Sequence, residues 1–299
     1  MNERADDDVL IRAMPLVFVL IWSTGFIVAR YGMPLAPPMT FLALRYAFSI
    51  LCFLPWIMLA GVSWPRTRAQ WLHLSVTGVL MHGGYLGGVW AAVKAGMGAG
   101  LIALIVGLQP VLTAFWLSAT GGRITRRQWT GLLLGFAGLV LVVSRKLGAG
   151  GEASIFNLSL AVFALLCITT GTLYQKRHVT RCDARSANAV QLLAALLVTL
   201  PLALLETEPV HWNTQFIGAL AWSVLVLTLG GSSLLYILIQ RGAATVVTSL
   251  MYLVPPTTAV MAWLLFSEPI TATTLAGIAL TALGVSLVVA RRHRPGRLE

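Results

Sequence analysis

The chain is poor in charge. Only 10% of its 299 residues are Asp, Glu, Lys or Arg, whereas soluble proteins contain about 25%. So few charged side chains cannot cover the surface of a soluble domain of this length. Disorder is excluded as well, because 58% of the residues are hydrophobic and the mean hydropathy is +0.83. The composition therefore indicates a protein that lies in a lipid bilayer.

Metal-binding and catalytic patterns are also missing. Three cysteines, Cys52, Cys167 and Cys182, form an odd and widely spaced set, and the five histidines are scattered. No CxxC pair and no GxxxxGK[ST] phosphate loop is present. All ten acids fall in predicted loops or near the chain ends, so a carboxylate-coupled pump has no acid at membrane depth to use. We expect no metal, no cofactor and no enzyme activity.

Ten apolar segments are long enough to be transmembrane helices, since about 20 residues cross a hydrocarbon core of about 30 Å. The predicted spans are residues 11–31, 38–60, 70–93, 97–119, 127–144, 155–175, 186–205, 212–239, 243–266 and 271–290. The acidic N-terminus lacks the basic start of a secretory signal, so we expect the first span to be retained. The sequence therefore predicts an all-α polytopic membrane protein without a separate soluble domain.

The chain repeats itself with a constant offset of 146 residues. Residues 91–146 align without a gap on residues 237–292, with identical residues at twelve positions. Five spans per copy is an odd number, so the two copies must cross the membrane in opposite orientations. We predict two inverted five-helix repeats, residues 1–149 and 150–299. Inverted repeats are typical of transporters that alternate access around a site between the halves.

The basic residues predict the orientation. With the N-terminus inside, sixteen of the 21 Lys and Arg lie in inner segments, four lie in outer segments, and Arg45 lies within a span. Cytoplasmic loops carry the excess of positive charge. We therefore predict a multi-pass protein of the bacterial inner membrane with both termini in the cytoplasm. The net charge of +11 is explained by this orientation, and no nucleic-acid partner is expected.

Two ionisable side chains lie inside predicted spans. Arg45 lies about 10 Å along the second span, and its counterpart in the repeat, Gln191, is also polar. Arg45 either binds a substrate carboxylate or contacts helix-end carbonyls and the interface, and the sequence leaves both open, with Gln191 as a second such contact. His82 shares a helix face with Tyr85, and Trp90 follows in the same glycine-rich span. We predict that this face lines a cavity.

Proline interrupts the fourth and ninth spans. Gln109 precedes Pro110, and Pro255 and Pro256 hold the equivalent positions. Proline removes a backbone donor, and carbonyls freed in this way inside a bilayer must face protein or a water-filled cavity. We predict these three prolines as hinges, with a merely kinked helix as the alternative. Substrate contacts are predicted at seven residues, which are Trp22, His82, Tyr85, Trp90, Gln109, Tyr252 and Trp263.

The fifth and tenth spans contain small residues instead of ligand-binding groups. Gly131 and Gly135 form a GxxxG pattern, and Gly277, Thr281 and Gly284 keep similar spacing. Small residues let helices approach closely in membranes. We predict that these spans brace the two halves or form a dimer contact, so that the protein is a monomer or a weak homodimer.

The second half ends in Pro256, the run LLFSEPIT at residues 264–271, Gly277 and Gly284, and the first half repeats this pattern from Pro110. In this pattern the chain resembles the EamA-type drug/metabolite transporter superfamily over essentially its whole length. Within the superfamily it most resembles the YddG-like exporters of aromatic and other amino acids.

This resemblance implies two five-helix halves of opposite orientation, a central cavity lined by spans one, three, four, six, eight and nine, and export of small metabolites. Glu268 fits the acid often found in the motif, whereas Gly122 replaces it in the first half. We expect a facilitator for aromatic and other neutral amino acids that works by alternating access. A multidrug or nucleotide-sugar carrier is the alternative within transport, and a lipid-modifying membrane enzyme is the alternative outside it.

Overall fold

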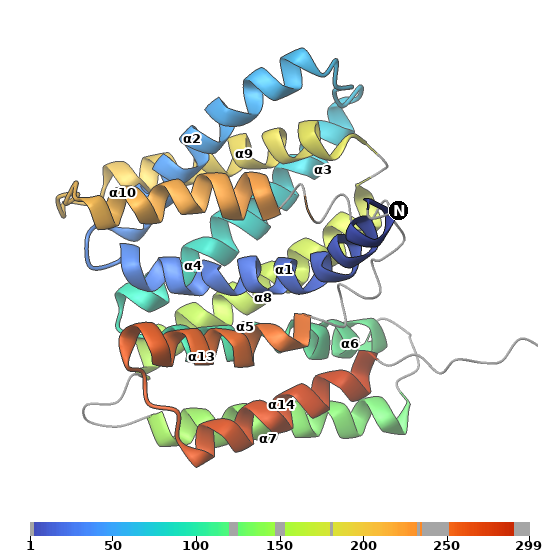
Figure 1. The fold of residues 1–299 in the computed structure, drawn as a ribbon, viewed down its shortest axis with the longest axis vertical. Helices are drawn as coiled ribbons and strands as arrows, with labels where there is room; N and C mark the ends of the chain where they lie inside the picture. Colours follow the sequence, from blue (N-terminus) through green and yellow to red (C-terminus); the bar gives the residue numbers. More distant parts are fainter. Residues whose placement is uncertain are drawn as a thin grey trace, which may run out of the picture.

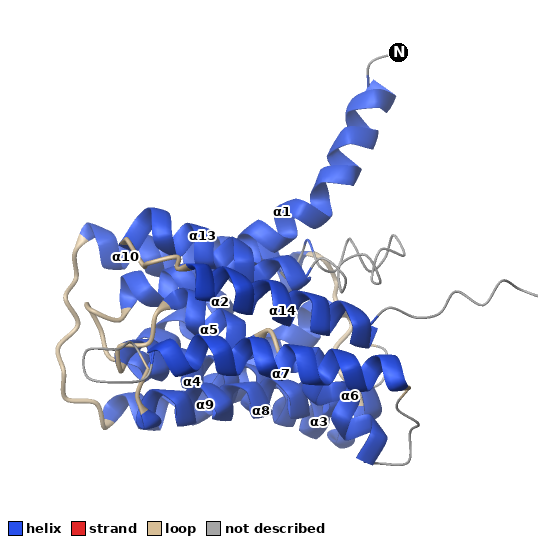
Figure 2. Ribbon diagram, turned by 90° about the horizontal axis from the view of Figure 1, so that it is seen from below, coloured by secondary structure: helices blue, strands red, loops and turns tan. Residues whose placement is uncertain are grey.

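The computed structural model describes residues 3–119, 125–146, 153–179, 182–231, 234 and 251–289. These described residues form a bundle of helices and contain no strand (Figures 1 and 2). Six helical stretches among them are long and apolar enough to cross a membrane, judged by length and composition, and four shorter helices are also apolar. The all-α membrane fold predicted from the sequence is confirmed.

The described residues of the first half form seven α-helices. They are α1 (Glu3–Gly32), α2 (Pro38–Leu59), α3 (Arg68–Gly78), α4 (Tyr85–Lys94), α5 (Ala99–Val106), α6 (Gln109–Ala119) and α7 (Arg126–Lys146). A π-helical turn, η1 (Val79–Gly84), joins α3 to α4, so that one predicted span is continuous. Figure 2 shows the N-terminal part of α1 extending beyond the bundle.

The second half follows the same order. Its elements are α8 (Ile155–His178), α9 (Ala184–Leu204), α10 (Thr214–Ala221), the π-helical segment η2 (Trp222–Gly230), the 3₁₀ turn η3 (Met251–Leu253), α13 (Val254–Phe266) and α14 (Ala272–Val289). The end of the predicted eighth span and the start of the ninth, within residues 232–250, lie outside the described residues apart from residue 234. α1 begins at Glu3, well before the predicted start at residue 11, and the other predicted spans agree with these helices to within a few residues.

Local sequence determines where several helices begin. The Thr67 hydroxyl accepts a hydrogen bond from the Gln70 amide at the start of α3, and Ser154 does the same at the start of α8. Asn213 caps α10. Such caps satisfy amides that have no partner within the helix. Pro38 opens α2, a position at which the missing amide hydrogen carries no cost.

Both proline-marked spans are broken helices. In the fourth span α5 ends at Val106 and α6 begins at Gln109, so Pro110 lies in the first turn of the new helix. In the ninth span Pro255 and Pro256 lie in the first turn of α13, directly after η3. Proline is tolerated in a first turn because the amide that it lacks would be unpaired there. The two interruptions therefore occupy equivalent places, and their role as hinges stays a prediction.

The helices α7 and α14 show that the halves are inverted. Gly138 lies against Gly277 and Thr281, whereas Gly284 lies against Gly135. Residue numbers therefore fall along α7 as they rise along α14, so the two helices are antiparallel. Because α7 and α14 are the same helix of the two copies, antiparallel packing means that the copies have opposite orientations. The inverted repeat and the close packing of these glycine-rich helices are confirmed.

The pair α2 and α9 repeats this arrangement. Ser186 at the start of α9 donates a hydrogen bond to the Ser63 carbonyl beyond the end of α2, at 2.8 Å. At the other end, the Thr40 amide of α2 donates to the Glu206 carboxylate beyond the end of α9, at 2.8 Å. Figure 1 shows α2 beside α9 at one side of the bundle and α7 beside α14 at the other, with the remaining helices between them.

Candidate functional site

A cavity of about 130 Å³ lies in the middle of the bundle. It is bounded by α1, α2, η1, α4, α8 and η2. Five residues that the sequence singled out line it together, namely Trp22, Arg45, His82, Tyr85 and Trp90. The other lining residues are Gly25, Phe26, Met81, Leu86, Val89, Ile168, Leu227 and Thr228. The cavity therefore combines aromatic rings, a few polar groups and one guanidinium.

The two halves meet symmetrically at this cavity. Met81 and Leu227 are related by the 146-residue offset, and so are His82 and Thr228. Both members of each pair line the cavity. A site that receives equivalent positions from both copies lies on the axis that relates them, which is where inverted-repeat transporters bind their solutes.

Arg45 is held inside the cavity wall by the second half. It is 8% exposed, its Nε donates a hydrogen bond to Thr228 Oγ1 at 3.2 Å, and its guanidinium carbon lies 5.6 Å from the centre of the Trp90 ring. The repeat maps Arg45 and Thr228 onto Gln191 and His82, and these two side chains also interact with each other. Each half thus sends one polar side chain from α2 or α9 to the π-helical segment of the other.

These contacts favour a cavity-facing Arg45 over one that contacts helix-end carbonyls or the interface, and its role in binding stays a prediction. The guanidinium contacts Thr228 and Trp90 and no helix-end carbonyl among the described residues. It does not reach outward either, because the side chain is almost fully buried. Within the described part of the chain, no hydrogen bond or ion pair of its Nη groups is found.

The π-helical segments carry the symmetric polar pair. His82 lies in η1 and Thr228 in η2. A π turn disturbs the regular helical hydrogen bonds and is frequent at functional sites. Side chains bond carbonyls in both segments: Tyr46 Oη donates to the His82 carbonyl at 2.8 Å, and Thr228 Oγ1 donates to the Ser223 carbonyl at 2.9 Å. These bonds fix the backbone on both sides of the cavity.

Two predicted contacts do not line this cavity among the described residues, and their role in binding stays a prediction. Gln109 Nε2 donates to Thr172 Oγ1 at 2.9 Å, between α6 and α8. Trp263 is 51% exposed, on the face of α13 away from the buried Ala262. The side chain of Tyr252 lies outside the described residues.

The set of spans that line the cavity also differs from the one implied by the resemblance. The second span contributes Arg45, whereas no described residue of spans four and nine lines the cavity. Thr228 is the polar residue that sequence reasoning missed. The 146-residue offset maps His82 onto Thr228, so the repeat itself contained the signal that could have found it.

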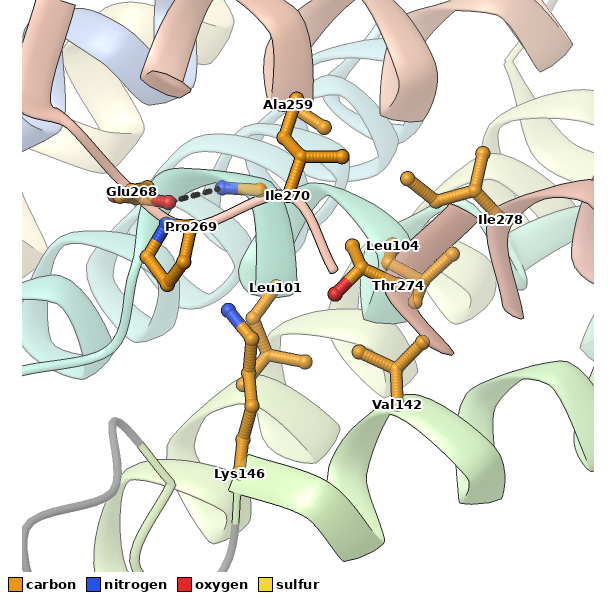
Figure 3. Close-up of a pocket in the computed structure, with 11 residues that line it drawn as sticks. Leu101, Leu104, Val142, Lys146, Ala259, Glu268, Pro269, Ile270, Thr274 and Ile278 are labelled. Carbon is orange, nitrogen blue, oxygen red and sulfur yellow. Dashed lines mark hydrogen bonds between the residues drawn. The ribbon is translucent and has the colours of Figure 1, made fainter. Parts of the chain in front are cut away.

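One end of the bundle is closed by acids from the second half. Glu206 accepts hydrogen bonds from the first amides of α2, including that of Thr40 at 2.8 Å. Glu268 accepts from the first amides of α5, including that of Ala99 at 2.9 Å. A carboxylate at a helix N-terminus is stabilised by unpaired amides and by the helix dipole. Figure 3 shows Glu268 beside a pocket of about 20 Å³, into which Lys146 also points.

Comparison with known proteins gives consistent results. The model of the EamA-like transporter family matches residues 12–144 and again residues 155–290. The chain is 28% identical to the uncharacterised transporter YvbV of Bacillus subtilis (strain 168), covering 92% of this chain and 90% of that protein. It is 25% identical to a probable amino-acid metabolite efflux pump of Salmonella typhimurium, covering 92% and 93%. One solved crystal structure shares the fold, with a TM-score of 0.64 at 18% identity over 93% of this chain and 96% of that one.

Proposed function

The chain belongs to the EamA-like transporter family, and from this premise we propose that it exports aromatic and other neutral amino acids and related small metabolites. Membership of the family and the apolar helices make the protein a polytopic membrane transporter. We further propose that it resides in the bacterial inner membrane with both termini in the cytoplasm, in agreement with the distribution of its basic residues. The relative described as a probable amino-acid metabolite efflux pump supports this class of solute.

The observation that carries the proposal is the buried guanidinium of Arg45 at a cavity shared by both halves. Its Nη groups present donors in the planar geometry that matches a carboxylate. A carboxylate is the group that all amino acids share at the backbone end. Arg45 is therefore the proposed anchor for the solute carboxylate, and His82 with Gln191 forms the polar contact on the other side of the axis.

The aromatic rings supply the contacts for the rest of the solute. Trp22, Tyr85 and Trp90 line the cavity. Ring faces stack on flat apolar side chains and attract an amino group through cation–π interaction. The cavity, at about 130 Å³, is smaller than the roughly 300–1,000 Å³ of pockets for drug-sized ligands. This size favours a small solute over a multidrug substrate or a nucleotide sugar.

The inverted halves suggest how the solute crosses. In the predicted orientation, Glu206 and Glu268 lie at the outer end, where they join the second half to the starts of α2 and α5. We propose that export opens these contacts as one half rocks against the other around the cavity. The breaks before Pro110 and Pro255 would then serve as hinges. No acid lies at membrane depth in the sequence, so the proposed carrier is a facilitator driven by the gradient of its solute.

Efflux from proteoliposomes tests the proposal. Vesicles loaded with labelled phenylalanine, with no proton or sodium gradient, are expected to lose it faster than protein-free vesicles. Trp22→Ala should slow the flux at least about tenfold, because a stacked ring contributes about 1 kcal/mol or more together with its buried area. Trp129→Ala is the matched control, since Trp129 is half-exposed on α7, and it should leave the flux unchanged.

Three outcomes would contradict parts of the proposal. Flux of a lipophilic cation or a nucleotide sugar without any flux of amino acids would overturn the proposed solute class. Flux that requires an imposed ion gradient would overturn the facilitator. Chemical turnover of a lipid by the purified protein, without translocation of any solute, would favour a membrane enzyme.

A further inference from the structure

The positive charge in the cavity has no counter-charge from the protein. Among the described lining residues, Arg45 alone carries a permanent charge. The sequence has no Asp or Glu between Asp8 and Glu152, and none between Glu208 and Glu268. An arginine stays protonated in proteins, and a buried charge without a partner is costly. The cavity therefore carries one positive charge for which its described lining residues supply no counter-charge.

The cavity wall also has more hydrogen-bond donors than acceptors. Of the donors on Arg45, only Nε has a partner in the described structure, and this partner is Thr228. Buried donors without acceptors cost free energy. A solute rich in acceptors, such as a carboxylate, removes this cost together with the charge imbalance.

A receptor for an ammonium group is missing from the same wall. The polar groups of the described lining residues other than Arg45 belong to His82, Tyr85, Thr228 and the indoles, and none is a carboxylate. The rings attract a cation by cation–π interaction, but the full charge of Arg45 repels it. The wall therefore recognises the acid end of an amino acid and gives the amino end little.

We infer, on the basis of the proposed export function, that the cavity selects solutes by net charge and that its preferred class is carboxylates of net charge −1. Amino acids whose amino group is acylated or missing belong to this class. The charge of Arg45 returns to its starting place in every transport cycle, so the net charge moved is that of the solute. An inside-negative membrane potential therefore drives export of the anion, by about 50-fold at equilibrium for each 100 mV.

Three matched probes separate charge from shape. N-acetylphenylalanine has net charge −1, phenylalanine has net charge 0, and phenylalanine amide has net charge +1 at neutral pH, with the same aromatic side chain. We expect the purified protein to bind N-acetylphenylalanine at least as tightly as phenylalanine, and phenylalanine amide at least tenfold more weakly. In proteoliposomes with a potassium diffusion potential set by valinomycin, the distribution of N-acetylphenylalanine should follow the potential and that of phenylalanine should not.

Variants of Arg45 link the selection to this side chain. Arg45→Gln should weaken N-acetylphenylalanine binding at least tenfold and abolish the preference over the amide. Arg45→Lys keeps the charge without the planar fork, so it should keep the preference at lower affinity, and it guards against a folding defect of the glutamine variant. Arg66→Gln removes one exposed positive charge elsewhere and is the control that should change neither binding nor preference.

The outcomes distinguish this inference from the proposed function. Transport of phenylalanine with no binding of N-acetylphenylalanine, or with equal binding of the amide, would overturn charge selection and leave amino-acid export standing. The same holds if Arg45→Gln retains the preference for the anion. If none of the three probes binds or moves while an unrelated solute does, the proposed function itself fails, and the charge selection fails with it.

Discussion

The two halves of the molecule share a backbone plan but differ in the side chains that they send to the cavity. α2 corresponds to α9, α7 to α14, and η1 to part of η2, each with the same offset of 146 residues. At the cavity, however, the side chains at equivalent positions differ. Arg45 of the first half corresponds to Gln191 of the second, and His82 corresponds to Thr228. The symmetric backbone is suited to opening toward either side of the membrane around one site. The asymmetric part gives that site its charge, so scaffold and solute recognition are encoded separately.

The largest expected effect comes from moving the charge between the halves. Arg45→Gln makes the first half resemble the second, and we expect it to reduce phenylalanine efflux about 100-fold, because one or two charge-assisted hydrogen bonds of about 1.5–3 kcal/mol are lost. Adding Gln191→Arg to this variant restores one guanidinium at the symmetric position, and efflux should recover at least about tenfold. Rates are compared at equal amounts of reconstituted protein.

One result would contradict the expected recovery of efflux in the double variant. A double variant as inactive as Arg45→Gln alone would mean that the two sides of the axis are not interchangeable. The single variant Gln191→Arg places two guanidinium groups at one cavity and should also be impaired, because like charges repel there.

The next effect tests the symmetric scaffold. Gly138 and Gly284 are equivalent, and a Cβ atom at Gly138 would lie 2.6 Å from the Gly277 carbonyl oxygen, while one at Gly284 would meet the backbone of Gly135. Either substitution to alanine should destabilise the protein by about 1–3 kcal/mol, because the backbones must separate. Thermal unfolding in detergent measures both. Gly218→Ala on α10, where a Cβ meets nothing within 4 Å, is the control.

Equal losses for the two glycines would support a symmetric contact between α7 and α14. A large loss for one glycine and none for the other would show that only one copy depends on close packing, which contradicts the scaffold described above.

A smaller effect compares the two ends of the bundle. Glu206 and Glu268 have Ala60 and Gly122 at the equivalent positions, so this pair of acids exists at one end only. Glu206→Gln and Glu268→Gln should each lower stability by about 1 kcal/mol, since an amide caps the helix without a full charge. The reference is Glu208→Gln, because Glu208 pairs with Lys94 at an exposed site, where ion pairs contribute little.

The two acids cap different helices, so their effects should add in the double variant. A thermal unfolding midpoint that neither substitution changes would show that the two carboxylates do not stabilise this end of the bundle.

The smallest effect concerns the starts of α2 and α9. Position 37 before α2 is proline, and the equivalent Asp183 caps α9 with its own carboxylate. Hydrogen bonds from Arg185 lower the pKa of the Asp183 carboxyl. Such a carboxylate stabilises the fold at pH values above its unfolded pKa, and this contribution is lost as the pH falls through the lowered pKa. Asp183→Asn should therefore cost about 0.5 kcal/mol near neutral pH.

Unfolding midpoints of the wild type and Asp183→Asn, measured between neutral pH and about pH 3, test this sign. The two curves should converge as the pH falls. Curves that diverge toward acid would contradict the stabilising role of the ionised carboxylate.

Sequence alone predicted the helices well and the site in part. Spans such as residues 38–60 agree with α2 at Pro38–Leu59, because a bilayer demands apolar segments of fixed length. Trp22 lies in the regular helix α1, whereas His82 lies in η1 and Tyr85 directly follows it, and all three line the cavity. Their role in binding stays a prediction.

Gln109 and Trp263 do not line this cavity among the described residues. Gln109 bonds Thr172 between α6 and α8, and no periodicity in the sequence records that pairing. Arg45 was found as an ionisable residue, but its contact with Thr228 depends on how two inverted halves meet, which only the structure shows.

The π-helical turns lie at matching places in the two halves. η1 (Val79–Gly84) maps onto the last six residues of η2 with the offset of 146 residues. A π turn disturbs the regular helical hydrogen bonds, and residues of both segments line the cavity. Each half therefore places its irregular backbone at the cavity, while the helices that pack the halves together stay regular.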